Sequence, residues 1–416
     1  MNNYFSVQTN FYGDATPQNL IDTYGSPLYV YNENILRERC REMAQLISYP
    51  QFKVNYSIKA NSNLELLKII RDEGLDADAM SPGEIHVLMA AGFKNDQIFY
   101  IGNNVSSAEM EYAIEHDILV SVDSVSQLET YGRINPGGKV AVRFNPGIGA
   151  GHHEKVVTGG KKTKFGVTPE HIDNVKALIL EFNLSLYGIN QHIGSLFMTP
   201  EAYLEGVGRL LNIAACFDRL DFIDLGGGFG TPYRKQAGEK RLDFKGLGTR
   251  LEEMLVSWVK SYGYNPIFKV EPGRYLLAEC GVLLGTVHAV KQSYETKYVG
   301  TDLGFNVLTR PVLYNSHHDL EVYQKAQLID PSKIEKVTVV GNICESGDII
   351  AKDRELLEIG EGDIIGVMDA GAYGYAMSSN YNNRLRPAEV LIKANGEPIL
   401  IRRRETIDDL MRTFCT

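Results

Sequence analysis

The sequence predicts an α/β protein in which a (β/α)8 barrel of the TIM type is followed by a C-terminal β-sheet or β-barrel domain. Three observations lead to this prediction. The chain has 416 residues, which is more than one small core accommodates. Short apolar segments alternate with helical patterns between residues 50 and 280, and strand-like segments without long helices follow residue 282.

Eight apolar segments are the expected strands of the barrel. Between them, apolar residues recur at helical spacing, as at Leu64, Leu67 and Ile70 after the first strand. Eight βα units in roughly 230 residues match the size of a closed barrel. An open doubly wound sheet normally has a glycine fingerprint in its first βα turn, but the turn here is Lys59-Ala60-Asn61, which favours the barrel. The expected strands are 53–58, 75–79, 98–101, 118–122, 139–144, 186–192, 222–225 and 267–270.

The segment after residue 282 is expected to form the β domain. Asn395-Gly396 stands between the apolar segments 390–392 and 399–401, and it is a strong signal for a two-residue hairpin turn. The predicted domains are therefore residues 32–282 for the barrel, and residues 1–31 with 283–416 for the β domain. The expected strands of the β domain are 287–290, 298–301, 336–340, 363–368 and 389–393, after a strand-like segment at 27–31.

The composition argues against several classes of protein. The net charge is -10, and lysine and arginine are dispersed apart from Arg402-Arg403-Arg404, so no basic face for nucleic acid is expected. No apolar run approaches the roughly 20 residues needed to cross a bilayer, and the N-terminus does not resemble a signal peptide. The five cysteines are widely spaced and the histidines lack the spacing of a helical zinc site, which is typical of a reduced, cytoplasmic protein without a metal site.

Polar residues follow almost every expected strand of the barrel. The C-terminal ends of the strands in such a barrel converge on one mouth, where active sites lie. Burying polar groups without partners costs roughly 2 to 7 kcal/mol, so a ring of them is expected to be paired or functional. The residues at these strand ends are Lys59, Asp78, Ser81, Asn103, Asp123, Arg143, Asn145, His192, Ser195, Gly226 to Gly228, Glu271 and Arg274.

Each of these groups also has an ordinary structural explanation. Lys59 follows an apolar strand, where desolvation would make its amine nucleophilic, but a solvated lysine is commoner at any one such position. The glycine-rich run 226–230 brings backbone amides close to an anion or simply forms a tight turn. The carboxylate of Glu271 could sit beside a cationic ring nitrogen while Arg274 binds an anion. Alternatively, the two residues could form an ion-paired turn. His192 is more often a core residue than a catalyst, and Ser195 could bind phosphate or cap a helix.

Taken together, these residues resemble the fold type III, alanine-racemase-like pyridoxal-phosphate enzymes, and most closely the diaminopimelate decarboxylase family. Any one motif is weak, but eight motifs in the expected order along most of the chain are specific. The motifs are Tyr56-Ser-Ile-Lys59-Ala-Asn61, Ser81-Pro-Gly-Glu84, His192-Ile-Gly-Ser195, Gly226-Gly-Gly-Phe-Gly230, Glu271-Pro-Gly-Arg274, Arg310-Pro-Val-Leu-Tyr314, Cys344-Glu-Ser-Gly-Asp348 and Gly371-Ala-Tyr373.

The resemblance implies a pyridoxal 5′-phosphate cofactor. Lys59 is expected to hold it as a Schiff base, and His192 is expected to stack on its ring as a catalytic residue. Glu271 is expected to pair with the pyridine nitrogen, so that the ring acts as an electron sink. The other residues expected at the cofactor and its phosphate are Ser195, Gly227, Gly228, Gly273, Arg274 and Tyr373.

The resemblance also implies contacts to an amino-acid substrate. Glu345 is expected to bind the distal amine, and Cys344 is expected to reprotonate the carbanion after carbon dioxide leaves, since a thiol is mostly protonated at neutral pH. In relatives these two residues come from the second subunit, so a homodimer with shared active sites is implied. The residues expected around the distal carboxylate are Arg274, Arg310 and Tyr314, and Tyr373 is a further expected substrate-binding residue.

The first hypothesis for function is the decarboxylation of meso-2,6-diaminopimelate to L-lysine, at the D-configured centre. The alternatives are the same chemistry on ornithine, arginine or a specialised biosynthetic intermediate, a non-catalytic cofactor-binding protein, and a racemase. A racemase usually has an arginine at the ring nitrogen, where Glu271 stands. Ser57, Pro82 and the loop 149–160 depart from the common pattern of the family, and the loop could border the substrate.

Overall fold

Two compact units make up the chain. The computed structural model describes residues 4–151, 158–160, 163–324 and 333–415. The barrel unit comprises Glu38–Thr231 and Arg241–Leu276, and the β unit comprises Met1–Arg37, Pro232–Lys240 and Leu277–Thr416. Within the described ranges, a helix with the length and apolar character needed to span a bilayer is absent.

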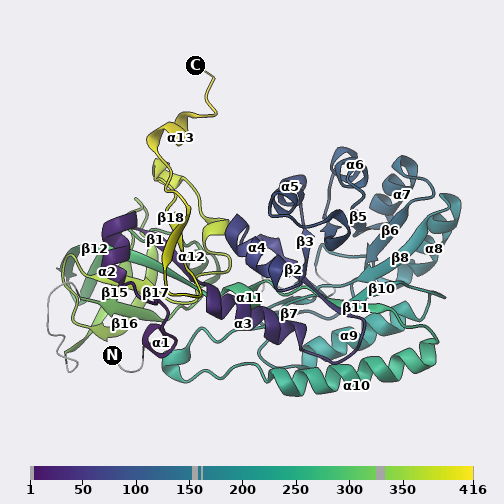
Figure 1. Ribbon diagram of the computed structural model, residues 1–416, viewed down its shortest axis with the longest axis horizontal. Coiled ribbons are helices and arrows are strands. Elements are labelled where there is room, and N and C mark those ends of the chain that lie inside the picture. The colour runs from purple at the N-terminus through teal and green to yellow at the C-terminus, as the bar shows by residue number, and fades with distance from the viewer. Residues whose placement is uncertain (1–3, 152–157, 161–162, 325–332, 416) are drawn as a thin grey trace. The chain divides into compact units, whose positions relative to one another are not determined.

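The barrel unit contains the closed barrel of eight parallel strands that the sequence predicts, and all eight expected strands are confirmed (Figure 1). Each strand pairs in parallel with two neighbours, and the pairing of β8 with β10 joins the later strands to the ring. The strands are β2 (Phe52–Ser57), β3 (Asp76–Ala79), β4 (Ile98–Ile101), β5 (Leu119–Val122), β6 (Lys139–Arg143), β8 (Ser185–Asn190), β10 (Phe222–Asp224) and β11 (Ile267–Val270).

Helices follow the strands and cover the outside of the barrel (Figure 1). Serine caps start several of them: Ser81 Oγ accepts the N–H of Glu84 at 3.2 Å, and Ser124 Oγ accepts the N–H of Gln127 at 3.2 Å. These caps stand just after strand ends, so the chain turns quickly from strand to helix. The helices are α3 (Glu33–Ala44), α4 (Leu64–Asp72), α5 (Pro82–Ala90), α6 (Ser107–Glu115), α7 (Val125–Ile134), α8 (Ile172–Glu181), α9 (Glu201–Ala214), α10 (Phe244–Tyr262) and α11 (Arg274–Leu277).

Apolar side chains from several strands pack inside the barrel. The rings of Phe99 and Phe222 lie edge to face with their centroids 5.3 Å apart, and Ile101 and Ala141 complete this buried cluster. The barrel therefore has a packed core rather than a pore, as is usual for this fold.

The β unit contains a nine-stranded mixed sheet. Strand β1 comes from near the N-terminus and pairs in parallel with β18 and antiparallel with β12. The expected hairpin at Asn395-Gly396 is confirmed, because β18 and β19 pair antiparallel on either side of it. Its turn is longer than the expected two residues, since the Lys393 N–H donates to the carbonyl of Glu397 at 2.9 Å. The strands are β1 (Leu28–Asn32), β12 (Gly281–Ser293), β13 (Thr296–Thr301), β14 (Leu320–Tyr323), β15 (Ile334–Val340), β16 (Ile349–Leu357), β17 (Ile364–Val367), β18 (Ala388–Ile392) and β19 (Pro398–Arg402).

Strands β14 and β16 are not among the strands expected from the sequence. The centre of β16 reads Lys352-Asp353-Arg354-Glu355, so it lacks an apolar pattern. The strand lies at one end of the sheet order, where charged residues are common because they oppose pairing with other chains. Short elements complete the described structure: helices α1 (Phe5–Gln8), α2 (Pro17–Tyr24), α12 (Arg310–Tyr314) and α13 (Ile407–Met411), and the strand pair β7 (Ala150–Gly151) and β9 (Gly194–Ser195).

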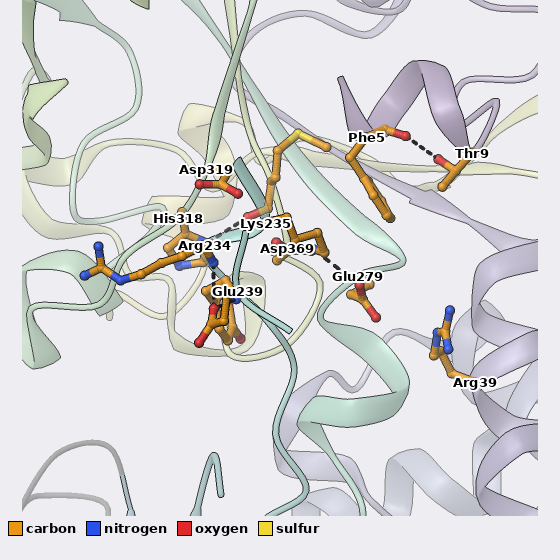
Figure 2. A network of polar contacts seen from close by, with 12 residues as sticks. Phe5, Thr9, Arg39, Arg234, Lys235, Glu239, Glu279, His318, Asp319 and Asp369 are labelled. Atoms are coloured by element: carbon orange, nitrogen blue, oxygen red, sulfur yellow. Dashed lines mark hydrogen bonds and ion pairs between the residues drawn. The ribbon is translucent and has the colours of Figure 1, made fainter. Parts of the chain in front are cut away.

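Lys235 ties the segment Pro232–Lys240 into the β unit, although this segment interrupts the barrel in the sequence (Figure 2). Its ammonium group bonds to the Asp369 carboxylate, lies 3.3 Å from Oε1 of Glu279 and stands 4.6 Å from the centroid of the Phe5 ring. Both carboxyl groups are almost completely buried. Burial raises the pKa of Asp369 to about 6, and Lys235 opposes this shift.

We predict that Lys235→Met destabilises the protein by about 3 to 5 kcal/mol, because it leaves two buried acidic groups without their cation. The loss is expected to be larger at pH 8 than at pH 5, since Asp369 is protonated at the lower pH and then needs no cation. Urea denaturation at both pH values measures it. Lys240→Met, an exposed lysine of the same segment, is the matched control, and equal losses in the two variants would contradict the prediction.

Candidate active site

The described residues at the C-terminal ends of the barrel strands form a polar cluster within the barrel unit. Lys59 lies in the short 3-10 turn Ile58–Ala60 that follows β2, His192 follows β8, and Glu271 comes directly after β11. Arg143 is the last residue of β6. Closure of the barrel brings these residues together from distant parts of the sequence, as the strand-end argument predicts.

Glu271 is the buried carboxyl group at the centre of this cluster, with 3% of its side chain exposed. Burial raises its pKa, while the positive charges of Lys59 and Arg143 act in the opposite direction. Its Oε2 atom lies 3.5 Å from Nδ1 of His192. The cluster thus holds an acidic group in a dry environment in which cations favour its ionised form.

His192 is a nearly buried imidazole beside Glu271. The N–H of Gly227 donates to its Nδ1 at 3.3 Å. Burial lowers the pKa of His192 well below its ordinary value, and the charges of Lys59 and Arg143 lower this pKa further. The ring is therefore neutral at neutral pH and presents an uncharged aromatic face.

Ser195 and Arg274 form a hydrogen-bonded pair at the same mouth. Ser195 Oγ accepts from Nη2 of Arg274 at 2.9 Å and from its Nε at 3.3 Å. Ser195 does not cap the following helix, because α9 begins at Glu201 with Pro200 at its cap position. The guanidinium group and the hydroxyl group are oriented by each other, and both are suited to an anion such as phosphate.

The glycine-rich run packs closely against neighbouring strand ends. A Cβ atom at Gly227 would lie 2.0 Å from the carbonyl oxygen of Glu271, and one at Gly228 would lie 2.6 Å from that of Gly194. Gly228 also has a φ of +106°, which side chains disfavour. The tight-turn explanation therefore accounts for glycine at both positions, whether or not an anion binds there.

Other strand-end residues have structural partners. Ser81 caps α5, and Asn103 donates to Asp123 at 2.7 Å. Asn145 organises the following loop: its Nδ2 donates to the carbonyl of Gly160 at 3.0 Å, and its Oδ1 accepts the N–H of Gly160 at 3.0 Å. These side chains hold loops in place, so the ring expected from the sequence mixes site residues with loop anchors.

The loop 149–160 lies partly outside the described residues, which omit 152–157. Its later end contacts the chain just after β8. Thr158 Oγ1 donates to the carbonyl of His192 at 3.0 Å, and the N–H of Gly159 donates to the carbonyl of Ile193 at 3.3 Å. This end of the loop therefore borders the candidate site.

The remaining predicted site residues belong to the β unit. Arg310 begins α12 and is 1% exposed, with its Nη1 3.0 Å from Nε2 of His318 and its guanidinium carbon 4.7 Å from the centroid of the Tyr233 ring. Tyr314 ends the same helix, and Tyr373 has a positive φ of 58°. Two further residues, Cys344 and Glu345, are exposed; the Cys344 N–H donates to Oδ1 of Asn382 at 3.1 Å, and Glu345 accepts from the Tyr381 hydroxyl.

Asp224 ends β10, has no exposed surface and is not among the site residues predicted from the sequence. Burial raises its pKa well above the ordinary value, and the neighbouring charge of Glu271 raises it further. Asp224 was missed because it stands inside an expected strand rather than after it. The available signal was an acidic residue near the end of an apolar strand, two residues before the glycine run.

Comparison with protein families matches residues 33–278 to the pyridoxal binding domain of the pyridoxal-dependent decarboxylases. The diaminopimelate decarboxylase of Methanothermobacter thermautotrophicus is 42% identical to this chain over 96% of the chain and 94% of that protein. The Escherichia coli K12 diaminopimelate decarboxylase is 35% identical over 98% of each chain.

Solved structures give the same result. The Helicobacter pylori diaminopimelate decarboxylase complexed with L-lysine superimposes with a TM-score of 0.86 and 30% identity, over 95% of this chain and 98% of that one. A lysine/ornithine decarboxylase from Vibrio vulnificus, complexed with putrescine, has a TM-score of 0.78 but only 19% identity, so it supports the fold alone.

Proposed function

Because the chain belongs to the diaminopimelate decarboxylase family of pyridoxal-dependent decarboxylases, we propose that it converts meso-2,6-diaminopimelate to L-lysine and carbon dioxide. The observation that carries the proposal is the buried Glu271 carboxyl group, flanked by Lys59, Arg143 and His192 at the strand ends of the barrel. The reaction requires a carboxylate beside a positively charged ring nitrogen, and Glu271 can provide one.

The side chains at the barrel mouth fit pyridoxal phosphate by their chemistry. The amine of Lys59 suits the aldehyde of the cofactor, and the carboxyl group of Glu271 suits its pyridine nitrogen. The hydrogen-bonded pair of Ser195 and Arg274 suits its phosphate. When bound, pyridoxal phosphate supplies an electron sink that delocalises the electron pair left by the loss of carbon dioxide.

The residues of the barrel unit would hold and tune this cofactor. Lys59 would bind it covalently through its amine, and Glu271 would keep a proton on the ring nitrogen by remaining ionised. The neutral ring of His192 would stack on the cofactor without adding a competing positive charge. The phosphate would be held in this unit by Ser195, Gly227, Gly228, Gly273 and Arg274, and Tyr373 of the β unit is proposed as a further cofactor-binding residue.

The residues of the β unit would select the substrate. The distal end of diaminopimelate carries both a carboxylate and an ammonium group, so a site for it needs both a cation and an anion. Arg310 and Tyr314 would bind the carboxylate, together with Arg274 of the barrel unit, and Glu345 would bind the ammonium group. Ornithine offers only the ammonium group, which would leave Arg310 without its anion. The thiol of Cys344 would return a proton to the substrate carbon after decarboxylation.

The proposal includes a homodimer in the cytoplasm. Cys344 and Glu345 are exposed, so both are available to a partner subunit, whose barrel would receive them. None of the five cysteines is in a disulfide bond in the described structure, which is consistent with a reducing compartment.

The proposal is tested by a substrate panel in which lysine and carbon dioxide are both measured. We expect equal amounts of the two products from meso-diaminopimelate and little turnover of ornithine or arginine. Lys59→Ala should abolish the yellow, borohydride-reducible cofactor and lower turnover by at least about 10³-fold. Lys68→Ala, a half-exposed lysine on α4, is the matched control. Failure to form lysine, with turnover of another amino acid, would overturn the proposed substrate.

Shared active sites predict complementation between two inactive chains. When Lys59→Ala and Cys344→Ala chains are mixed and allowed to exchange, half of the dimers are mixed, and each has one site with both native residues. Activity should therefore recover to about one quarter of the wild-type value. Cys216→Ala, an exposed cysteine, serves as the control partner and should leave activity unchanged on its own. No recovery in mixed dimers verified by mass spectrometry would show that each site uses one chain only.

A further inference from the structure

Asp224 is a buried acidic residue for which the proposed function has no role. It ends β10, and its neighbours in register are Asn190 on β8 and Lys269 on β11. Its Oδ1 accepts the N–H of Gly226 at 2.9 Å, and the carbonyl of Gly226 accepts the N–H of Glu271 at 3.1 Å. Gly226 thus connects the backbone positions of the two acidic residues.

Asp224 and Glu271 contact each other through their carboxyl groups. Within the described part of the chain, Oδ2 of Asp224 and Oε1 of Glu271 are buried oxygens that no N–H or O–H donor reaches. The two carboxyl groups lie within reach of each other, and their contact affects the pKa of both. Two ionised carboxylates only accept hydrogen bonds, so one of the pair must carry a proton.

We infer that Asp224 is a positioning residue that carries this shared proton at neutral pH and donates it to Oε1 of Glu271, holding Glu271 as an oriented carboxylate. The inference rests on the proposed function in one respect, namely that Glu271 faces the cofactor's ring nitrogen. The hydrogen bond occupies Oε1, which leaves Oε2, the oxygen nearest His192, for the mouth of the barrel.

The surrounding charges place the proton on Asp224 rather than on Glu271. Burial raises the pKa of both groups, but Lys59 and Arg143 counteract the shift at Glu271. The N–H of Gly226 and the charge of Lys269 lower the pKa of Asp224. This pKa nevertheless remains well above its ordinary value. Three other titratable groups interact with the pair: Asp78 on β3, Tyr203 on α9, and His192, which follows β8.

Lys269 approaches Asp224 from the opposite end of the barrel. Its ammonium nitrogen lies 4.6 Å from the centroid of Phe222 and 5.3 Å from that of Phe99, and the side chain lines a cavity of about 640 Å³ at the N-terminal ends of the strands. The positive charge of Lys269 lowers the pKa of Asp224. Asp224 therefore loses its proton at a lower pH than it would without Lys269.

The shared proton matters because it determines the charge that faces the mouth. With both groups ionised, two adjacent negative charges would repel each other, and Glu271 itself would tend to take up a proton. A protonated Glu271 could not stabilise a positively charged ring nitrogen. Asp224 therefore supplies a hydrogen bond in place of a second charge.

Infrared spectroscopy of the cofactor-loaded protein tests the inference without substrate. The wild-type minus Asp224→Asn difference spectrum at neutral pH should contain a carboxylic-acid C=O band, because the variant lacks the proton. Asp221→Asn, just before β10, is the matched control and should give no such band. Absence of the band in the first difference spectrum would overturn the inference, and this result is independent of which amino acid the protein decarboxylates.

The pH dependence of stability gives a second readout. The pKa of Asp224 is raised on folding, so its contribution to stability is present at low pH and is lost as the pH rises through the folded-state pKa. The melting temperature of the wild type should therefore fall relative to that of Asp224→Asn as the pH rises. In Lys269→Met this fall should continue to higher pH, since removing a cation near Asp224 raises its folded-state pKa further. Parallel curves for all three proteins would contradict the inference.

Kinetics separate positioning from simple structural support. Asn at position 224 can still donate a hydrogen bond to Glu271, whereas Leu cannot. Asp224→Leu should lower kcat by at least about tenfold, change KM less and move the acidic limb of the pH profile to higher pH. Asp224→Asn should retain more of the turnover. Equal losses in two variants that both fold and bind cofactor would rule out the hydrogen bond, while the substrate panel alone decides the proposed reaction.

Discussion

The proposed function depends on keeping the buried carboxyl group of Glu271 ionised. Removing a single charge from water costs several kcal/mol, and that cost is offset only by charges and hydrogen bonds placed around it. The charges and hydrogen bonds around Glu271 come from Lys59, Arg143 and Asp224, which lie in three different parts of the sequence. A closed parallel barrel satisfies the requirement because its strands end side by side around one mouth.

The two compact units carry different parts of the proposed chemistry. The barrel unit holds an amine, a neutral imidazole, a carboxyl group and a hydroxyl–guanidinium pair at the strand ends. The β unit holds the exposed Cys344 and Glu345 and the buried Arg310. This separation explains why a dimer is part of the proposal, since exposed polar residues on one chain are available to the barrel of another.

Much of the fold was predictable because periodicity reports local structure. All eight barrel strands and the Asn395-Gly396 hairpin follow from apolar patterns and turn residues. Strand β16 could not be predicted in this way, because an edge strand with a charged centre lacks the pattern. The position of the segment Pro232–Lys240 depends on the bonds of Lys235 to Asp369 and Glu279, which are distant in sequence.

The candidate site was predictable only where residues stand at strand ends. This rule found Lys59, His192 and Glu271, but it also included Asn145, which anchors a loop. It could not find Asp224, because the role of a residue inside a strand depends on what projects from the neighbouring strands. The pairing of Asp224 with Glu271 is a property of the closed barrel rather than of either segment.

Neutron diffraction from crystals of the cofactor-bound protein in heavy water tests the central claim most directly, because it locates the proton of the buried pair. We expect one deuteron between the two side chains, bonded to Oδ2 of Asp224, and none on Oε2 of Glu271. A deuteron bonded to Glu271, or none on either carboxyl group, would contradict it.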